Sequence, residues 1–483
     1  MAWQHQNILC NSKTFFHTMW KTILLLLLLL VFSHVASSQT IIETLPGYPG
    51  KLPFKMETGY IGVGEMADVQ LFYYFFESER DPVFDPLLLW LTGGPGCSGF
   101  SAIAFENGPL AIDRDKYSGG LPSLKYNPYS WTKIASIIFI DAPVGTGFSY
   151  ATTTEAANTS DTLSASQTYN FLRKWLVTHP KFLGNQVYIG GDSYSGIIVP
   201  LLVQDILQGI ESGLKPSIDL QGYLLGNPVT DYYIDDNSRI PFIHRVSLIS
   251  DEYYEDAKLY CNGDYLNVES NNTLCVTALQ NIKQSILQLK LTQILEPQCA
   301  FSSKKPGELE WDIRSQEANV IDSLQANKLP ELRCREFGYA LSYKYMNNET
   351  VQSALGVREG TLKTWNRCVK TFPTYTENVQ SSVYVHKNLS QTGLRALIYS
   401  GDHDISVPYV GTLEWIRSLE IAVFDEWRPW YVDGQVAGYQ TKFMNEHFRL
   451  TYVTVKGGGH TAPEYKPKEC QAMVDRWFAR YPI

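Results

Sequence analysis

The sequence predicts an α/β fold with a mostly parallel central sheet, helices on both faces and a helical cap inserted into it. Two observations lead to this prediction. Short apolar runs recur along the chain, at residues 68–76, 86–91, 136–141, 187–189 and 220–226. Runs of this kind are typical of strands, and the continuous ones are typical of strands buried on both faces. Helical patterns separate several of them, and strands that alternate with helices form mostly parallel sheets.

Length and composition allow one large domain with an insertion. The chain has 483 residues, of which 44% are hydrophobic, so a large core can form and disorder is not expected. From residue 231 to 345 the pattern becomes polar and helical and contains four of the cysteines. We therefore expect a core in two parts, 39–230 and 346–483, with a cap at 231–345. After the cap we expect the sheet to resume at residues 382–385 and again at Leu394. The net charge of −9 and the lack of a basic run argue against a nucleic-acid partner.

Ser193 lies in a turn between an apolar run and a helical pattern, with Gly191 before it and Gly196 after it. This is the strand–turn–helix context of a nucleophile elbow, in which small neighbours leave room around the serine. The match to G-x-S-x-G is imperfect, because Ser195 takes the place of the last glycine. Taken alone, the motif also allows a glycine-rich turn between a core strand and a helix.

Two later loops carry acids and a histidine. One apolar run leads into Asp402 and Asp404, and another leads into the glycine-flanked His460. Serine, aspartate and histidine thus follow in the order that α/β-hydrolases use for a catalytic triad, each just after a strand. Their joint occurrence predicts a triad of Ser193, His460 and one of the two acids.

A glycine-rich loop at residues 92–99 follows the buried run at 86–91. In α/β-hydrolases the equivalent loop supplies one backbone N–H to the oxyanion hole, and the residue after the nucleophile supplies the other. These donors are expected at Gly94 and Tyr194. The alternative is an ordinary tight turn, whereas a phosphate loop is excluded because no Gly-Lys-Ser/Thr follows. The cysteine spacings do not resemble a zinc site and no histidine cluster accompanies them, so we expect neither a metal nor a cofactor.

The N-terminus predicts entry into the secretory pathway. Lys21 precedes an apolar run that is too short to span a bilayer, and residues 1–38 are interpreted as a signal peptide. A retained membrane anchor and a start at Met19 are the alternatives. Secretion agrees with four N-glycosylation sequons, at Asn158, Asn271, Asn348 and Asn388. Cys10 falls in the leader, and the seven cysteines that remain are an odd number, so one should be unpaired or intermolecular.

Five motifs together resemble the serine carboxypeptidase family over essentially the whole mature chain. They lie at 90–99 (Trp-Leu-Thr-Gly-Gly-Pro-Gly-Cys-Ser-Gly), 106–109 (Glu-Asn-Gly-Pro), 191–196 (Gly-Asp-Ser-Tyr-Ser-Gly), 401–404 (Gly-Asp-His-Asp) and 458–460 (Gly-Gly-His). The resemblance implies Ser193 as the nucleophile, His460 as the general base and Asp404 as the acid. Asp404 is preferred because the family's acid lies four positions before the proline of a Val-Pro pair, which leaves Asp402 a structural role. The resemblance also implies three disulfides and one unpaired thiol: Cys97–Cys368, Cys261–Cys275, Cys299–Cys334 and the thiol of Cys470.

The expected substrate site departs from the peptidases of this family. Those enzymes resemble one another in holding the C-terminal carboxylate of the substrate with an Asn before the double glycine and a Glu before the nucleophile, near a second Glu. Here Thr92 and Asp192 occupy the first two positions, and Glu106 remains. When a polar partner is misplaced, a hydrogen-bonding site loses roughly 10⁴-fold of its preference for the substrate it was built to bind. The substrate site, expected to comprise Thr92, Gly93, Glu106 and Asp192, is therefore no longer suited to that carboxylate.

These replacements resemble the plant serine carboxypeptidase-like acyltransferases. The resemblance implies transfer of an acyl group, which we expect to be phenolic, from a 1-O-acyl glucose ester to an alcohol acceptor. The expected partners are these small molecules, and the expected location is the vacuole, with an extracellular location as the alternative. A serine carboxypeptidase active at acidic pH and a non-catalytic secreted partner subunit are the alternative functions. An exposed loop near Lys304 and Lys305 predicts cleavage into a two-chain form held by Cys299–Cys334.

Overall fold

The computed structural model describes residues 39–299, 335–361, 364–369, 372 and 374–483. The chain divides into two units, Met1–Thr40 and Ile41–Ile483, and the fold belongs to the second. Three predictions fall outside the described residues: the signal peptide, the cleavage site near Lys304 and Lys305, and the pairing of Cys334.

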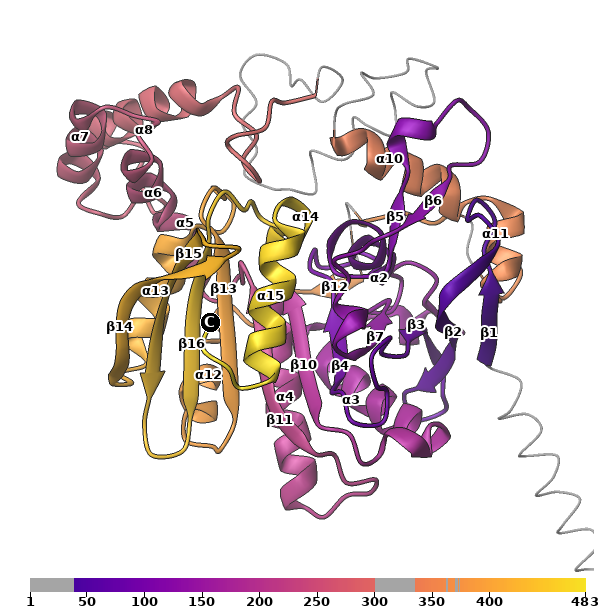
Figure 1. Cartoon of the computed structure of the whole chain (residues 1–483). Coiled ribbons are helices and arrows are strands. Elements are labelled where there is room, and N and C mark those ends of the chain that lie inside the picture. Colours follow the sequence, from indigo (N-terminus) through magenta and orange to yellow (C-terminus); the bar gives the residue numbers. More distant parts are fainter. Residues whose placement is uncertain (1–38, 300–334, 362–363, 370–371, 373) are drawn as a thin grey trace, which may run out of the picture. The chain divides into compact units, whose positions relative to one another are not determined.

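A twelve-stranded sheet forms the centre of the second unit (Figure 1). In spatial order its strands are β1 (Gln39–Thr44), β2 (Lys51–Val63), β3 (Val69–Phe76), β7 (Ser136–Ile140), β4 (Leu87–Leu91), β10 (Val187–Asp192), β11 (Leu220–Gly226), β13 (Arg395–Gly401), β16 (Arg449–Val455), β15 (Gln435–Met444) and β14 (Val423–Val432), with β8 (Tyr150–Ala151) on β3. The six strands from β7 to β16 run parallel, and antiparallel strands flank them. Two short pairs lie outside this sheet: β5 (Leu110–Ile112) with β6 (Leu124–Tyr126), and β9 (Thr159–Ser160) with β12 (Tyr375–Thr376). The predicted α/β fold with a mostly parallel sheet is confirmed.

Helices cover both faces of the sheet, as predicted. Because side chains alternate along a strand, β4 directs Leu88 and Trp90 into one apolar cluster and Leu87 and Leu89 into another. The helices α3 (Asp161–Thr178) and α4 (Ser195–Glu211) pack into the second cluster. The C-terminal helix α15 (Pro467–Phe478) packs into the first. Between α4 and β16 lie shorter helices, among them α13 (Tyr409–Ser418), and α14 (Ala462–Tyr465) precedes α15.

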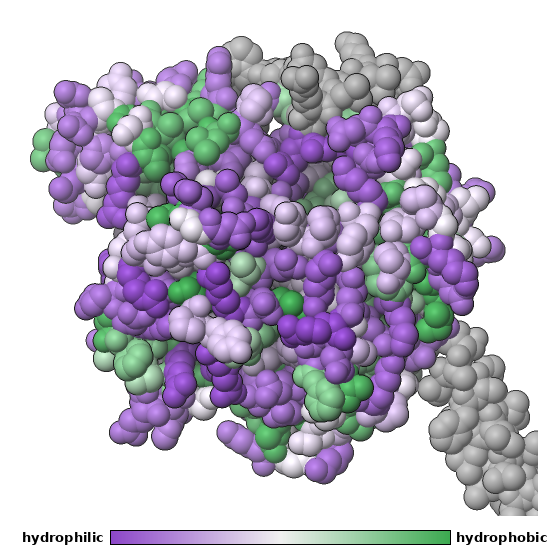
Figure 2. Space-filling view, viewed as in Figure 1, coloured by the Kyte–Doolittle hydropathy of each residue, from purple (hydrophilic) through white to green (hydrophobic). Residues whose placement is uncertain are grey.

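The described part of the predicted cap is helical. Its helices are α5 (Tyr232–Asn237), α6 (Arg239–Arg245), α7 (Asp251–Cys261), α8 (Thr273–Ile286) and α10 (Arg335–Met346), followed by α11 (Glu349–Ala354). The helices α6 to α8 share an apolar cluster that includes Phe242, Ala257 and Ile282. Figure 2 shows a largely hydrophilic face, with a group of hydrophobic residues over these helices.

One predicted strand is wrong. Residues 382–385 were expected to resume the sheet, but they enter the helix α12 (Val383–Leu389), and the sheet resumes only at Arg395. The β-branched and aromatic side chains at 383–385 favour a strand locally. However, Val385, His386 and Leu389 are buried, which is the spacing of one helix face. The residues between and before them, Tyr384, Lys387 and Asn388, are exposed. Packing of this face into the core outweighs the local preference.

Candidate active site

The nucleophile elbow joins β10 to α4. Ser193 has a backbone φ of 54°, a value that L-residues rarely adopt, and its N–H donates to the carbonyl of Gly226 at 2.9 Å. A Cβ added to Gly196 would lie 2.3 Å from the carbonyl oxygen of Val229, so this position has room only for glycine. The motif's shifted glycine therefore serves the same purpose as the last glycine of G-x-S-x-G, because it allows the helix to approach the next loop closely.

Ser193, His460 and Asp404 form a continuous hydrogen-bonded chain. His460 Nε2 lies 2.8 Å from Ser193 Oγ, and His460 Nδ1 lies 2.7 Å from Asp404 Oδ2. Since an ionised carboxylate can only accept, the ring proton is on Nδ1 and Nε2 accepts from the serine hydroxyl. Asp404 is fully buried and also accepts the backbone N–H groups of Ser406 at 2.8 Å and Val407 at 3.2 Å.

The surroundings of His460 favour its protonated form. Burial by itself lowers the pKa of the imidazole, but the charge and hydrogen bond of Asp404 and the charge of Asp192 outweigh it, so the net pKa is raised. The charge of Arg239 acts in the opposite direction. A histidine that takes a proton readily and holds it between two carboxylates is suited to general base catalysis.

Asp402 lies in the same loop but makes different contacts. Its Oδ1 accepts the N–H of Gly457 at 2.7 Å and lies 2.5 Å from Nδ1 of His403. These contacts join the loop after β13 to the loop after β16. Asp402 thus has partners other than His460, whereas Asp404 is hydrogen-bonded to that histidine.

The loop after β4 lies against the elbow. A Cβ on Gly93 would lie 2.6 Å from Ser193 Cβ, so the two backbones are in direct contact. Tyr194 follows Ser193 in the chain, and Gly94 lines the same cavity as Ser193. In the part of the chain that the structure describes, neither of their N–H groups has an internal hydrogen-bond acceptor. Both are therefore free to donate to an oxygen beside Ser193, as an oxyanion hole requires.

Two buried acids hold this region in place. Asp141 accepts the hydroxyl of Ser98 at 2.7 Å and the N–H of Gly99 at 2.8 Å, which fixes the end of the glycine-rich loop. Asp161 accepts the phenol of Tyr194 at 2.7 Å, which fixes the residue after the nucleophile. Sequence reasoning did not identify either acid, since no local pattern distinguishes them from other aspartates.

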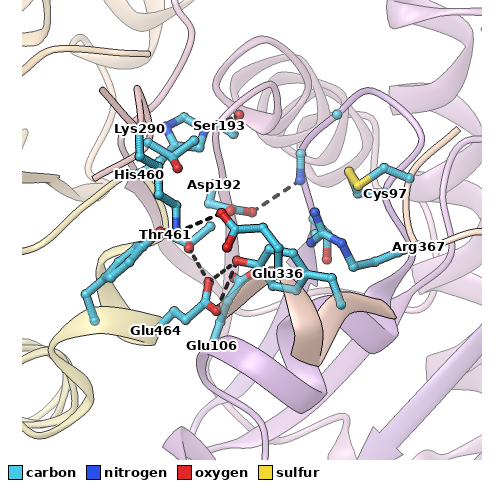
Figure 3. Close-up of a pocket in the computed structure, with 17 residues that line it drawn as sticks. Cys97, Glu106, Asp192, Ser193, Lys290, Glu336, Arg367, His460, Thr461 and Glu464 are labelled. Atoms are coloured by element: carbon cyan, nitrogen blue, oxygen red, sulfur yellow. Dashed lines mark hydrogen bonds and ion pairs between the residues drawn. A yellow bond between two sulfur atoms is a disulfide. The ribbon is translucent and has the colours of Figure 1, made fainter. Parts of the chain in front are cut away.

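The four predicted substrate-binding residues line one cavity with Ser193 and His460. The cavity has a volume of about 870 Å³ including its open mouth, and Thr92, Gly93, Glu106 and Asp192 all border it (Figure 3). The N–H of Gly93 donates to Asp192 Oδ1 at 3.2 Å. By contrast, the hydroxyl oxygen of Thr92 and Oε2 of Glu106 are buried and have no hydrogen-bond partner among the described residues.

Burial shifts Asp192 and Glu106, the two acids among these four residues, towards their neutral forms. It raises the pKa of Asp192 to about 6, against the opposing influence of His460 and of the N–H of Gly93. It also raises the pKa of Glu106 well above its usual value, and the neighbouring charges of Asp192 and Glu464 add to the effect. The surroundings of Glu106 therefore favour its neutral form, in which the carboxyl group can donate a hydrogen bond.

Sequence reasoning missed a charged network on the cap side of the cavity. Lys290 lies 3.1 Å from Glu336, and Arg335 lies 3.2 Å from Glu464. Arg367 faces the same cavity with its guanidinium 4.1 Å from the ring of Tyr339 (Figure 3). These residues come from separate segments and form no motif, so only the folded chain brings them together.

The cap also contacts both catalytic loops through its backbone. The N–H of His460 donates to the carbonyl of Thr292 at 2.8 Å, and the N–H of Ile405 donates to the carbonyl of Leu291 at 2.8 Å. The side chain of Gln293 donates to the carbonyl of Gly457 at 3.0 Å. The segment 291–293 thus fixes the loops that carry the acid and the histidine.

Two of the three expected disulfides are present, Cys97–Cys368 and Cys261–Cys275. The first ties the glycine-rich loop to the loop that carries Arg367 and spans 271 residues. Cys299 is also disulfide-bonded, but Cys334 lies outside the described residues. Cys470 is a buried free thiol, as expected.

Most of the predicted glycosylation sites lie on the surface. Of the four sequon asparagines, Asn158, Asn271 and Asn388 are exposed, and Asn348 is half-buried. Among the residues that the structure describes, no helix has the length and apolar character that crossing a bilayer would need.

Comparison with known proteins gives a consistent result over the whole chain. The sequence profile of the serine carboxypeptidase family matches residues 46–480. Serine carboxypeptidase-like 2 of Arabidopsis thaliana is 46% identical over 474 residues, which cover 98% of this chain and 100% of that protein. Serine carboxypeptidase-like 1 of the same plant is 47% identical over 463 residues, covering 95% of this chain and 97% of that protein.

A solved structure shows the same fold. The prohormone-processing carboxypeptidase Kex1Δp of Saccharomyces cerevisiae has a TM-score of 0.69 at 19% identity, and the match covers 92% of this chain and 96% of that chain. With the family profile and the plant relatives, this likeness leads to one conclusion: the chain belongs to the serine carboxypeptidase family.

Proposed function

We propose that the protein is an acyltransferase that moves an acyl group, phenolic in our proposal, from a 1-O-acyl glucose ester to an alcohol. The reaction passes through an ester on Ser193. The hydrogen-bonded chain from Ser193 to Asp404 supports a nucleophilic serine. The intact chain also argues against a non-catalytic partner subunit, which would need no reactive serine.

In the first half-reaction Ser193 Oγ attacks the ester carbonyl, and its proton moves to His460 Nε2. The proton on Nδ1 stays between the imidazole and Asp404, which stabilises the imidazolium. The N–H groups of Gly94 and Tyr194 donate to the oxyanion of the tetrahedral intermediate. When this intermediate collapses, the bond to the sugar oxygen breaks, and His460 returns the proton to the leaving glucose.

The second half-reaction repeats these steps with the acceptor. The alcohol hydroxyl attacks the acyl-Ser193 carbonyl while His460 Nε2 takes its proton. Collapse of the second tetrahedral intermediate releases the product ester and returns the proton to Ser193. Transfer prevails over hydrolysis when the acceptor is held closer to the acyl carbon than water is.

The observation that carries the choice of transferase over peptidase is the hydrogen bond from Gly93 to Asp192. The N–H of Gly93 borders the nucleophile but is already used by the protein's own carboxylate. A peptide's C-terminal carboxylate would lose this donor, find a hydroxyl at Thr92 instead of an amide, and face the charge of Asp192 above its pKa of about 6. Sugar hydroxyls can both donate and accept, so they suit Thr92 and Glu106 better.

One observation favours a carboxypeptidase as the second candidate. Burial raises the pKa of Glu106 and so favours its neutral form, and burial raises the pKa of Asp192 to about 6, so that Asp192 takes up a proton at acidic pH. At acidic pH both acids could therefore donate to a substrate carboxylate. Peptide hydrolysis, if present, should be confined to acidic pH.

The test offers purified protein two kinds of substrate. A panel of 1-O-acyl glucoses is supplied with alcohol acceptors, and an N-blocked dipeptide is supplied separately, each at acidic and neutral pH. We expect ester exchange that requires acyl glucose and depends on Ser193. Release of the C-terminal residue without ester exchange would overturn the proposal in favour of the carboxypeptidase.

We further propose that the protein travels through the secretory pathway, is glycosylated and reaches the vacuole. The exposed sequons and the two disulfides support passage through an oxidising compartment. Removal of N-glycans should lower the apparent mass of the native protein, and fractionation of source tissue distinguishes the vacuole from the cell exterior.

A further inference from the structure

Asn227 lies in the backbone segment that holds the nucleophile. It follows β11, which lies between β10, the strand that leads to Ser193, and β13, the strand that leads to the acid. The carbonyl of Gly226 accepts the N–H of Ser193 at 2.9 Å, and the N–H of Val229 donates to the carbonyl of Ser193 at 2.8 Å. Residues on both sides of Asn227 thus fix the serine backbone.

The side chain of Asn227 reaches the acid. Its Nδ2 donates to Asp404 Oδ2 at 3.0 Å, the same oxygen that lies 2.7 Å from His460 Nδ1. Its Oδ1 accepts the N–H of Gly401 at 2.9 Å. The orientation of the amide follows from these partners, because a flipped amide would turn its oxygen towards the carboxylate and its NH₂ towards an N–H donor.

The backbone of Asn227 is held in an uncommon conformation. Its φ is 39°, in the left-handed region that asparagine tolerates better than most residues, and its side chain is fully buried. The N–H of Asn227 donates to the carbonyl of Tyr399 in β13 at 2.8 Å. The residue is therefore fixed by both its backbone and its side chain, as at functional sites where surrounding contacts hold an unfavourable conformation.

We propose that Asn227 is a positioning residue of the triad, whose amide holds the Asp404 carboxylate at a fixed place relative to the elbow that carries Ser193. The inference rests on the proposed function, since it takes Ser193 to be the nucleophile. Asp404 keeps the N–H donors of Ser406 and Val407 without the amide, but it loses its link to β11. The imidazole of His460 would then follow a less constrained carboxylate.

The amide also affects proton transfer. A donor to Asp404 stabilises its charge, so removal of the donor makes the carboxylate a stronger acceptor for His460 Nδ1–H. The charged groups that act on His460 are Asp404, Asp192 and Arg239, and none of them changes when Asn227 is replaced by glycine. The expected result is a higher pKa for His460, so that the acidic limb of the activity profile moves to higher pH.

Two variants of the full chain test the proposal. Asn227→Gly removes the amide and tolerates a positive φ, so the backbone is not strained. Asn227→Asp keeps the shape and the acceptor for Gly401 but sets a second carboxylate against Asp404. The matched control is Asn262→Gly, since Asn262 also has a positive φ, of 52°, but caps α7 on the exposed surface. The readouts are the rate at which a fluorophosphonate labels Ser193, measured from acidic to neutral pH, and the thermal midpoint.

The expected loss in labelling rate is about tenfold for Asn227→Gly, as for other groups that orient a reacting residue, and larger for Asn227→Asp. The acidic limb moves to higher pH in Asn227→Gly, while Asn262→Gly labels like the unchanged protein. Unchanged rate and profile in a folded Asn227→Gly would overturn the inference and leave the proposed function standing. The inference is also overturned, and the proposed function still stands, if Asn227→Gly and Asn262→Gly lose labelling rate equally and neither shifts the pH profile of labelling. If the unchanged protein fails to label at all, the proposed function and the inference both fail.

Discussion

The two halves of the cavity differ in how far their polar atoms are satisfied from within the protein. On the triad side, Asp404 accepts four hydrogen bonds, from His460, Asn227, Ser406 and Val407. On the substrate side, the hydroxyl oxygen of Thr92 and one carboxyl oxygen of Glu106 are buried without a partner in the part of the chain that the structure describes. Groups that must keep one geometry are fixed by the fold, whereas groups that must bind a ligand are left unsatisfied until it arrives.

The largest expected effect is the loss of acyl transfer in Ser193→Ala, a substitution on the triad side of the cavity. This substitution removes the nucleophile, and acyl transfer should fall by about 10⁴-fold or more. The thermal midpoint should stay within a degree or so, because the hydroxyl makes no contact needed for packing. Transfer assays with a differential scanning measurement check both points. Retained turnover in the purified variant would remove Ser193 from the mechanism.

The substrate side is tested by restoring the peptidase-like side chains in the double variant Thr92→Asn, Asp192→Glu. The amide returns a donor for a carboxylate, and the longer acid frees the N–H of Gly93. We expect hydrolysis of an N-blocked dipeptide at acidic pH to rise by about 10²-fold, with a matching loss of ester exchange. Either single variant is the control. A double variant that gains no hydrolysis while it still labels with a fluorophosphonate would show that other residues decide the specificity.

The two described disulfides give a graded comparison. Cys97–Cys368 spans 271 residues and borders the cavity, whereas Cys261–Cys275 spans 14 residues within the cap. Loss of the first, as Cys97→Ser with Cys368→Ser, should cost about 5.5 kcal/mol of stability by loop length and also lower the labelling rate of Ser193. Loss of the second should cost about 3 kcal/mol and leave the rate unchanged. Denaturant unfolding and labelling kinetics measure the two effects, and equal rates in both variants would contradict the proposed role of the first.

The smallest expected effect is a dependence of stability on pH. Burial raises the pKa of Asp141 and Asp192 to about 6 and that of Asp235 to about 7, so the native state holds protons that the unfolded state releases above its pKa near 3.8. Stability from these groups is present at low pH and is lost as pH rises towards 7, by on the order of 1 kcal/mol for each group. His460, whose pKa is raised, acts in the same direction.

Glu296 sets the acidic limit of this window. Charge pairing with Arg335 and Lys290 overcomes the effect of burial and lowers the pKa of Glu296 to about 2, so its contribution is present above the usual pKa of 4.5 and is lost below it. The thermal midpoint should therefore be highest at about pH 4, where the contribution of Glu296 is largely present and that of the three aspartates is not yet lost, and it should fall between pH 4.5 and 7. Asp192→Asn should flatten the fall towards neutral pH, and an unchanged slope in this variant would contradict the assignment.

Some secondary-structure elements that we did not predict are nevertheless indicated by the sequence. The hairpin of β14 and β15 turns at Asp433 and Gly434, both with positive φ, and an Asp-Gly pair between strand-like runs is a strong hairpin signal. The helix α12 carried a weaker one, because its buried positions follow a helical spacing that competes with its β-branched residues. The error at α12 comes from weighing local strand propensity above the helical pattern, whereas the hairpin was not predicted because its Asp-Gly turn was not considered.

The sequence by itself determined the parts of this protein that depend on local chemistry and order along the chain. A strand, a tight turn and a helix can be read from a few neighbouring residues. Ser193 and His460 could therefore be named with their loops and the acid narrowed to Asp402 or Asp404, between which the family resemblance favoured Asp404. Parallel strands end at one edge of a sheet, which makes their convergence predictable. Only the tertiary structure decided what surrounds them: the amide of Asn227, the cap segment at 291–293 and the charged network around Glu464. These contacts join residues far apart in the chain, and their energies depend on distances and burial that no local pattern specifies.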